Sequence, residues 1–247
     1  MNIQFNNWQQ INPSSLTSAF EGGFNEMEGF LNSFDAVFDT FNNTIETNTQ
    51  LVGTTFSGIS YNILGRNFLD DVPTSTVTSL SLSDATRNAL FTGSVTYNYD
   101  TDFYSGAYNK LSYNSGSTNL LILGTMNVNG FGELANATYT QYNITSNGFA
   151  INLTGNILAN ANGDATGGTI SSFTLSDNLG NSLSASGLAL SAITFDSLTS
   201  VVNSPTNFAN LFNLLTSSAS LSSNDLITGD AGDNTILVMQ VMTRSMA

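Results

Sequence analysis

The chain contains no cysteine, no histidine and very few basic residues. Its 247 residues include four Lys and Arg against 18 Asp and Glu, which gives a formal net charge of −14. Without Cys and His there can be no disulfide framework, thiolate nucleophile, zinc finger or histidine-based catalytic triad. Four cations cannot neutralise a phosphate backbone, so we expect no nucleic-acid partner.

Long apolar runs are also missing. No stretch reaches the 18 apolar residues that a transmembrane helix needs, so we expect no transmembrane segment. Residues 1–11 lack the basic start, apolar centre and small-residue cleavage site of a secretory signal. We therefore expect a cytoplasmic protein or one exported without an N-terminal signal peptide.

Neutral polar residues are abundant instead. Ser, Thr and Asn account for 95 residues of the chain, whereas only 9% of the residues are charged. Threonine suits strands, and asparagine and glycine suit turns. With 40% hydrophobic residues the chain can bury a core, so its acidity does not indicate disorder.

Residues 1–53 form a first region that predicts a phenylalanine-rich amphipathic helix. Apolar residues follow one another at intervals of 4, 3, 4, 3, 4, 3 and 4 residues, at Phe20, Phe24, Met27, Leu31, Phe34, Phe38, Phe41 and Ile45. This is the repeat of a helix with one apolar face. We expect the helix to begin with a cap at Ser14 or Ser15, and Gly22 and Gly23 to weaken it by about 1 kcal/mol each.

The apolar helix face has three interpretations. It can lie on the protein's own sheet, which we favour, or it can bind a second copy of the chain. The candidate self-association residues are Phe20, Phe24, Leu31, Phe34, Phe38 and Phe41. Membrane binding is the least favoured, because the opposite face is acidic and anionic lipids repel it.

Residues 54–198 form a repetitive β region. Apolar and polar residues alternate over 91–99, 120–128 and 149–157, which predicts half-buried strands. Asn129-Gly130, Asn147-Gly148 and Asn162-Gly163 predict tight turns. Strict alternation favours antiparallel sheets with one wet face.

A longer rhythm runs through the same region. Gly93, Gly124 and Gly155 are 31 residues apart, and Gly187 follows 32 residues later. A unit of this length is one β-hairpin, and stacked hairpins bury a common face. We therefore predict a mainly β fold, an antiparallel hairpin-repeat meander, sandwich or solenoid-like sheet with an N-terminal amphipathic helix.

Residues 199–247 hold a predicted short helix at 207–215 and then two nonapeptides in register, 220–228 and 229–237. The second nonapeptide begins Gly229-Asp-Ala-Gly232 and resembles the glycine-rich repeat of the repeats-in-toxin (RTX) family, G-G-x-G-x-D-x-U-x. The resemblance implies bound Ca²⁺. The candidate ligands are Asp225, Asp230, Asp233 and Asn234.

The tail departs from that repeat and covers only two units. Asp230 stands in place of the second glycine, and Asn234 in place of the aspartate. Three interpretations stay open: a calcium site completed by another molecule, a site completed by the rest of the fold, or a remnant that caps the sheet. The family resemblance also implies type I secretion, and so an extracellular or cell-surface location.

Other acidic pairs point to turns. Asp70-Asp71 and Asp100-x-Asp102 adjoin turn-like sequence, where carboxylates are usually solvated, and calcium binding is a better expectation for them than catalysis. Haem binding would depend on tyrosine alone, because histidine is absent.

Two functions follow as hypotheses. The first is a secreted, non-enzymatic structural protein that self-assembles as an oligomer or polymer into matrix, filament or surface layer, with calcium-dependent adhesion and glycan or cell-surface contact. The alternative is a secreted Ca²⁺-dependent hydrolase or carbohydrate-binding module.

Overall fold

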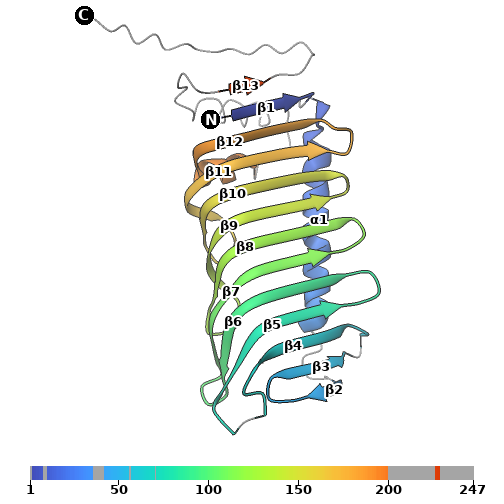
Figure 1. Cartoon of the computed structure of the whole chain (residues 1–247), viewed down its shortest axis with the longest axis vertical. Coiled ribbons are helices and arrows are strands. Elements are labelled where there is room, and N and C mark those ends of the chain that lie inside the picture. Colours follow the sequence, from blue (N-terminus) through green and yellow to red (C-terminus); the bar gives the residue numbers. More distant parts are fainter. Residues whose placement is uncertain are drawn as a thin grey trace, which may run out of the picture.

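A single open β-sheet forms the body of the molecule in a computed structural model of the chain (Figure 1). The structure describes residues 2–7, 10–35, 42–55, 57–69, 71–199 and 226–228. Its helices are α1 (Pro13–Asp35) and α2 (Ala192–Thr199). Its strands are β1 (Asn2–Asn6), β2 (Asn42–Glu46), β3 (Gln50–Thr54), β4 (Ser60–Arg66), β5 (Thr74–Ser83), β6 (Asn88–Asn98), β7 (Phe103–Asn114), β8 (Thr118–Val128), β9 (Leu134–Ser146), β10 (Phe149–Ala159), β11 (Ala165–Asp177), β12 (Ser182–Ser191) and β13 (Leu226–Thr228).

The sheet is an antiparallel meander. From β2 to β12 each strand pairs with the next one in the chain, and β1 then joins β12 antiparallel. The short strand β13 adds to β1 in parallel. The predicted mainly β fold with hairpin repeats and an N-terminal helix is confirmed, in its meander form.

The start of α1 differs from the prediction. Asn12, not Ser14 or Ser15, caps the helix, because its Oδ1 accepts hydrogen bonds from the backbone N–H groups of Ser14 (3.0 Å) and Ser15 (3.3 Å). Pro13 then occupies the first helical position, where a missing N–H costs nothing.

The apolar spacing that predicts the helix also extends too far along the sequence, into a strand. Ile45 continues the apolar spacing of the helix, but it lies in strand β2. Residues 43–45 are Asn-Thr-Ile, and the β-branched pair Thr44-Ile45 favours an extended backbone once it can pair with β3. The spacing therefore continues past the helix by coincidence.

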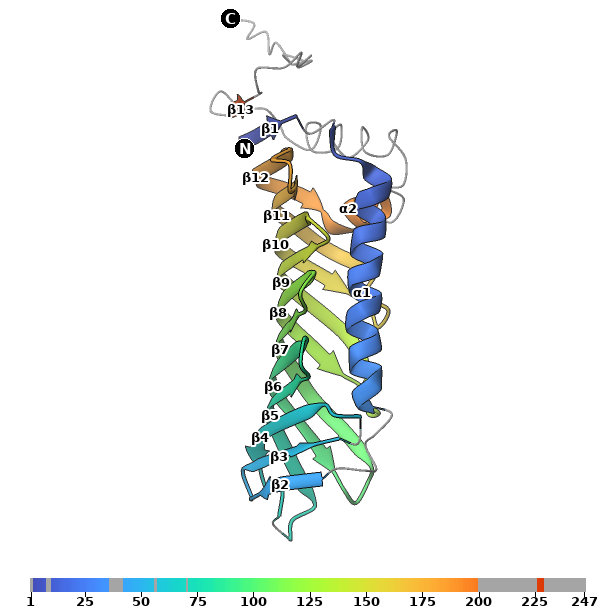
Figure 2. The same cartoon turned by 90° about the vertical axis from the view of Figure 1, so that its right-hand side faces the viewer.

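Helix α1 runs across the strands on the concave side of the sheet (Figure 2). Its 23 residues give a length of about 35 Å, enough to cross about seven strands spaced about 4.8 Å apart. The side that faces the sheet carries the buried residues Leu16, Ala19, Gly23 and Phe30. Phe20, Phe24 and Leu31 flank this stripe and are half-buried.

The two halves of α1 pack on different parts of the core. Leu16 belongs to a cluster formed mainly by β1, β11, β12 and α2. Phe30, which is 0% exposed, belongs to a cluster formed mainly by β4 to β10. Phe20 packs against both clusters, so the helix joins the two halves of the core.

Gly23 permits a close approach of α1 to the sheet. A Cβ at this position would lie 2.9 Å from Ser146 Oγ and 3.1 Å from Thr118 Cγ2. One turn later, Glu26 Oε2 accepts a hydrogen bond from Thr118 Oγ1 at 3.1 Å. Gly22 has open space around its Cα and makes no such approach. Of the three glycines in α1, Gly22, Gly23 and Gly29, only Gly23 is therefore required by packing.

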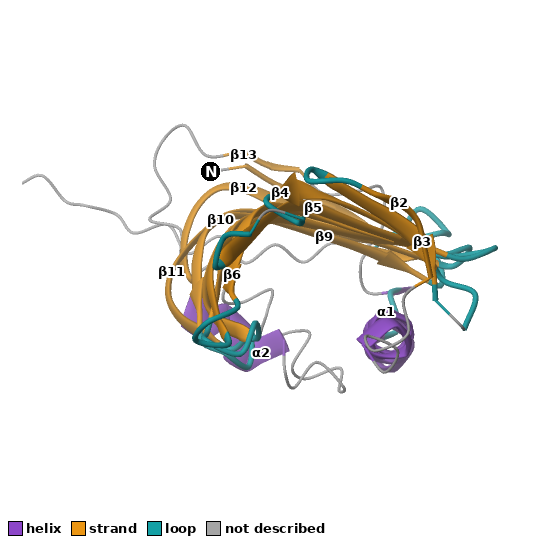
Figure 3. Cartoon of the chain, turned by 90° about the horizontal axis from the view of Figure 1, so that it is seen from below, coloured by secondary structure: helices purple, strands orange, loops and turns teal. Residues whose placement is uncertain are grey.

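The glycines that recur every 31 residues mark bulges in the sheet. Register shifts occur at Gly93, Gly124 and Gly155, where β6, β8 and β10 meet the strand that follows each. A Cβ on these glycines would lie 2.1 to 2.3 Å from a backbone carbonyl oxygen of that strand. Bulges bend a strand, and the sheet curves strongly around its concave face (Figure 3). The 31-residue spacing of these glycines therefore marks one bend in each β-hairpin.

The hairpin loops repeat as well. Asn147 and Gly148, with φ of 49° and 86°, form the predicted two-residue turn. The other two predicted turns are five-residue loops, 129–133 and 160–164, in which the first Asn accepts two backbone hydrogen bonds. The residue with positive φ in the first loop is Gly132, not the predicted Gly130.

Helix α2 was not predicted from sequence. It follows β12 directly, and Ser191 Oγ accepts a hydrogen bond from the N–H of Thr194 at 3.4 Å. Phe195 of α2 is buried against Phe173, with ring centroids 5.3 Å apart. No helix among the described residues is long and apolar enough to cross a membrane.

Candidate functional site

The sheet is open, so its two edges are the first candidate sites. At one end lies β2, and in the described part of the chain no strand pairs with its outer side. Residues Asn43 to Glu46 are exposed. Asn43 is held from within the sheet, because its Oδ1 accepts a hydrogen bond from the Tyr61 hydroxyl at 2.5 Å. Burial and the nearby Glu46 carboxylate raise the pKa of Tyr61, so this hydroxyl stays a donor.

The backbone N–H and C=O groups of Glu46 point to the outer side of the sheet edge. The N–H of Thr47 donates to the carbonyl oxygen of Gln50 at 2.9 Å, which closes the β2–β3 hairpin. Because hydrogen-bonded and non-hydrogen-bonded pairs alternate, the next pair, Glu46 and Leu51, is non-hydrogen-bonded. The N–H and C=O of Glu46 therefore point away from β3, toward any strand that would add to this edge.

The opposite edge is formed by β13 and β1. Leu226, Ile227 and Thr228 pair in parallel with the first three residues of β1, Asn2 to Gln4. Ile227 occupies the apolar slot of the first nonapeptide, and it lies in a strand as the resemblance implies. The described part of the tail thus extends the sheet edge.

The two edges run in opposite directions. Ten antiparallel pairings lead from β2 to β12, so these two strands point the same way. Strand β1 is antiparallel to β12, and β13 is parallel to β1. Both β1 and β13 are therefore antiparallel to β2. The two edges lie at opposite ends of the long axis of the molecule (Figure 1).

The predicted calcium ligands Asp225, Asp230, Asp233 and Asn234 lie outside the described residues. Within the described ranges, no three His, Cys, Asp or Glu side chains come together as a metal site. Calcium at the tail stays a prediction from sequence.

The predicted self-association residues fall into two groups. Phe20, Phe24 and Leu31 pack against the core of their own chain, as in the interpretation that we favour from sequence. Nothing is described of the Phe34 side chain, and Phe38 and Phe41 lie outside the described residues. For the described part of α1, the structure shows packing on the chain's own sheet.

Of the acidic pairs, Asp100 and Asp102 lie beside a group of aromatic rings at the β6–β7 turn. The Tyr97 hydroxyl donates to Asp102 Oδ1 at 2.6 Å, and this hydrogen bond raises the pKa of Tyr97 to about 12. The Tyr97 ring lies 4.9 Å from that of Tyr99 and 4.7 Å from that of Tyr104. The sequence indicates a turn between two tyrosine-rich strands here, but it does not show which rings meet. For the other pair, Asp71 lies in an exposed bend and Asp70 is outside the described residues.

A third candidate is an apolar groove on the concave side, with a volume of about 630 Å³. Its floor is formed by β9, β10 and β11, and α1 and α2 form its walls. Sequence reasoning missed this groove, because α2 was not predicted and the lining comes from distant parts of the chain.

Comparison with known proteins adds no relative: no family model, no curated protein and no solved structure matches the chain. The function of the protein is therefore inferred from the geometry of the chain itself.

Proposed function

We propose that the protein is a non-enzymatic structural protein that self-assembles head to tail, through the edges of its sheet, into an extracellular filament, matrix or surface layer. The observation that carries this proposal is the pair of outer edges, which no other strand covers among the described residues; they lie at opposite ends of the sheet and run antiparallel to each other. The extracellular location follows from the RTX resemblance of the tail.

The directions of the edge strands allow the antiparallel sheet to continue from one copy of the chain to the next. A second copy in the same orientation brings its β2 next to β13 of the first. Because these strands are antiparallel, the junction continues the antiparallel pattern on the β2 side. Such a contact joins two different surfaces, so it adds copies without closing. Thirteen strands about 4.8 Å apart give an axial repeat of about 60 Å per copy.

Each junction is weak by itself. Strand β2 has five residues and a register shift near Thr44, and both features limit edge pairing. The net charge of −14 also makes copies repel one another. We expect assembly to require high protein concentration and to increase when salt screens the charge.

The test is an edge substitution with a matched control. Glu46→Pro removes the outward N–H of Glu46 but no hydrogen bond inside the sheet, and proline is tolerated at such edge positions. Glu46→Thr removes the same charge and keeps the N–H. We expect sedimentation and negative-stain microscopy to show polymers of wild type and Glu46→Thr, and at least tenfold fewer polymers of Glu46→Pro.

Two results would contradict the proposal. One is a wild-type protein that stays monomeric at high concentration and high salt. The other is equal polymerisation of Glu46→Pro and Glu46→Thr, because the β2 edge would then play no part. Melting temperatures of all three proteins serve as the control for folding.

Calcium gives a separate arm of this experiment. If Asp225, Asp230, Asp233 and Asn234 bind Ca²⁺, the ion fixes residues on both sides of β13 in the sequence and neutralises part of the charge. We expect EGTA to reduce polymer formation and to lower the melting temperature. An unchanged melting temperature with EGTA would exclude calcium at these residues and leave the edge pairing to be judged by Glu46→Pro.

The aromatic group at the β6–β7 turn supports glycan binding as a second candidate function. Tyr99 and Phe103, which flank this turn, are each 53% exposed, and Phe131 of the β8–β9 loop is 83% exposed. The Asp102 carboxylate lies in the same turn, where it accepts a hydrogen bond from the Tyr97 hydroxyl. Exposed aromatic rings mark binding surfaces, and they stack on sugar rings while carboxylates hydrogen-bond to hydroxyls. We expect Tyr99→Ala to weaken retention on a polysaccharide column, and Leu179→Ala, at an exposed apolar residue in another loop, to leave it unchanged. Equal retention of both variants would contradict glycan binding here.

A further inference from the structure

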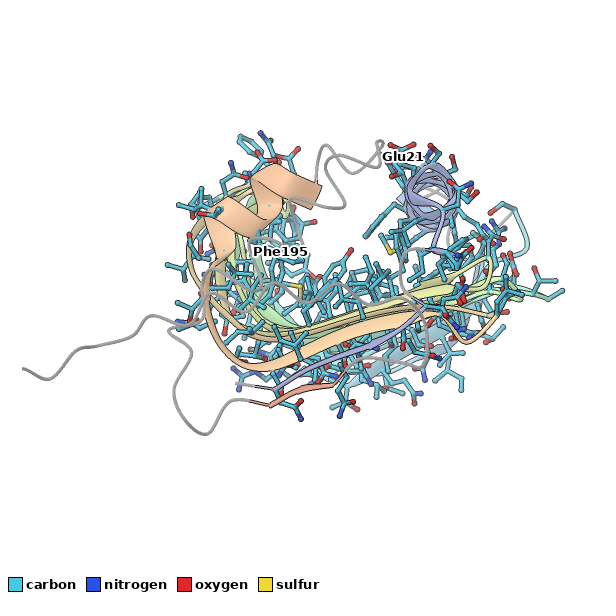
Figure 4. All side chains as sticks on the ribbon, turned by 90° about the horizontal axis from the view of Figure 1, so that it is seen from above. Glu21 and Phe195 are labelled. Atoms are coloured by element: carbon cyan, nitrogen blue, oxygen red, sulfur yellow. The ribbon has the colours of Figure 1, made fainter. Side chains whose placement is uncertain are left out.

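The convex face of the sheet, on the side away from the helices, is a surface separate from both sheet edges. Figure 4 shows α1 with Glu21 and α2 with Phe195 together on the concave side. In the described part of the chain no helix lies over the convex side (Figure 3). Among the described residues this face is therefore open to a partner.

Residues on this face form three continuous rows across eleven strands, β1 and β12 to β3. Each strand contributes three alternating residues, and those of β8 are Asn119, Leu121 and Leu123. The row through Asn119 has Ser, Thr or Asn at ten of its eleven positions. Its central members are Ala150, Thr145, Asn119, Asn114, Asn88 and Ser83.

The three rows contain one charged residue and no carboxylate. The charged residue is Lys110, which pairs with Leu123. The described Asp and Glu residues lie instead on α1 and α2, at strand ends and in the loops and turns. In a chain with a net charge of −14, a contact through the helices would bring carboxylates of two copies together. A contact through the convex face would not.

The rows cover enough area for a stable contact between two copies. Eleven strands about 4.8 Å apart and three rows about 6.8 Å apart give a face of about 1,000 Å². A standard protein interface buries about 800 Å² on each partner. Two convex faces that overlap over most of their length therefore reach this size.

Polar side chains of the rows already hydrogen-bond to one another between strands. Thr154 Oγ1 bonds to Ser172 Oγ at 2.5 Å, and Gln50 Nε2 donates to Asn62 Oδ1 at 3.0 Å. Such pairs keep their hydrogen bonds when a partner covers them, so their burial costs less free energy than the burial of unpaired groups.

Apolar side chains lie in the middle of the face. Leu121 and Leu123 belong to β8, the sixth of the eleven strands, and Leu90 lies two strands away on β6. All three are half-buried, so each retains surface that a partner can cover. An apolar centre within a polar surround is the usual composition of a protein interface.

We propose that the convex face binds the convex face of a second copy of the chain, around a two-fold axis that runs along β8. This axis sets Leu121 and Leu123 against the same residues of the second copy. It places Lys110 on β7 opposite Gln141 on β9, not opposite a second lysine. The contact leaves both sheet edges free, so it is independent of the head-to-tail assembly proposed above and joins two filaments side by side.

Matched leucine substitutions test the face in the full-length Glu46→Pro chain, where edge pairing is blocked. Analytical ultracentrifugation of this chain should show a monomer–dimer equilibrium. Adding Leu121→Asp places a carboxylate at the centre of the contact and should weaken the dimer at least tenfold. Adding Leu179→Asp makes the same change at an 81% exposed loop residue and should alter the dissociation constant by less than twofold.

Either of two results would overturn the face contact. One is a Glu46→Pro chain that stays monomeric at high concentration, and the other is an equal effect of the two Asp substitutions. Leu121→Asp in a chain with Glu46 intact should still form head-to-tail polymers. Failure of the face contact and failure of the edge contact are therefore distinguishable.

A disulfide test locates the two-fold axis and does not depend on the folding of an Asp variant. Leu121→Cys should form a disulfide-linked dimer on mild oxidation, seen on a non-reducing gel. Ser184→Cys, at a half-buried residue of the same row four strands away, should form almost none. Equivalent residues of a head-to-tail filament lie about 60 Å apart, so edge pairing cannot produce the Leu121→Cys link. Equal yields from the two variants, or no dimer of Leu121→Cys, would overturn the proposal.

A different partner would give a different result. A neutral polysaccharide could also lie on rows of hydroxyl and amide groups. If Leu121→Asp weakened retention on a polysaccharide column while the Glu46→Pro chain formed no dimer, the face would bind glycan, and the proposal would be overturned.

Discussion

The two faces of the sheet are built from the same strands but differ in almost every physical property. One row of paired residues, Tyr142, Leu153, Phe173, Ala185 and Ile3, faces the helices and forms part of the core. The adjacent row, one residue along each strand, is Asn143, Asn152, Thr174, Ser184 and Gln4. Both helices lie on the concave side (Figure 3).

The convex face uses neutral hydrogen bonds where most proteins use charge. Thr154 Oγ1 bonds to Ser172 Oγ at 2.5 Å, and Asn127 Nδ2 donates to Asn136 Oδ1 at 2.7 Å, both between neighbouring strands. With 9% charged residues, the chain has few ion pairs to place there. Side-chain packing on the concave face therefore stabilises the fold. Because the convex face is neutral, the backbone N–H and C=O groups at the sheet edges offer the most directional contacts to a partner.

The largest expected contrast is a core deletion against a convex-face deletion. Phe30→Ala removes a fully buried ring that packs at 5.9 Å from the Tyr113 ring, and should lower the free energy of unfolding by about 3 to 5 kcal/mol. Asn152→Ala, at an exposed position, should change it by about 0.5 kcal/mol or less. Urea unfolding measures both. A cost below about 1 kcal/mol for Phe30→Ala would mean that α1 does not hold the concave core.

The row of bends gives the second contrast. Gly124 has φ of 152°, and a Cβ there would lie 2.1 Å from the carbonyl oxygen of Thr138. We expect Gly124→Ala to cost about 2 to 3 kcal/mol, because the bulge must shift. Gly116→Ala has open space and should be nearly neutral. Similar melting temperatures for the two variants would show that the bend does not need the glycine.

The neighbouring glycines of α1 give a smaller contrast of opposite sign. Gly22→Ala should stabilise the protein by about 0.5 to 1 kcal/mol through helix propensity alone. Gly23→Ala gains the same propensity but places a methyl group 2.9 Å from Ser146 Oγ, so it should be less stable than Gly22→Ala by about 1 to 2 kcal/mol. Equal stability of the two variants would contradict the close approach of α1 to the sheet.

The smallest effect is expected in acid, at the turn before β6. The N–H of Thr86 and the Arg87 guanidinium donate to Asp84, and together they lower its pKa to about 2. A lowered pKa stabilises the fold above pH 4, and this contribution is lost as pH falls toward 2. Asp84→Asn should remove about 1 kcal/mol at pH 7, a value reduced for partial exposure, and flatten the loss between pH 4 and 2. Parallel acid profiles of unfolding free energy for variant and wild type would contradict this role.

Local pattern predicted the local parts of this fold. Alternation located β6, β8 and β10, and the 31-residue glycine rhythm located their bends, because each signal depends on residues close in sequence. The end of α1 was wrong because Ile45 keeps a helical spacing in a segment that pairs with β3.

Long-range parts had no such signal. The pairing of β1 with β12 joins Asn2 to Ser186, and the groove collects residues from α1 and α2 that are more than 160 positions apart. Alternation shows which face of a strand is buried, but not which strand is its neighbour. Neither the open edges nor the groove could therefore be read from the sequence, and the calcium ligands remain a prediction.

The most direct test of head-to-tail assembly is a cross-link between the two edges, since the natural chain has no cysteine. Glu46→Cys labels β2 and Thr228→Cys labels β13, and each purified variant is treated with a bismaleimide alone or after mixing with the other. The account predicts cross-linked dimers in the mixture and almost none in either variant alone. Cross-linking of Glu46→Cys to itself, or equal yields in all three samples, would contradict it.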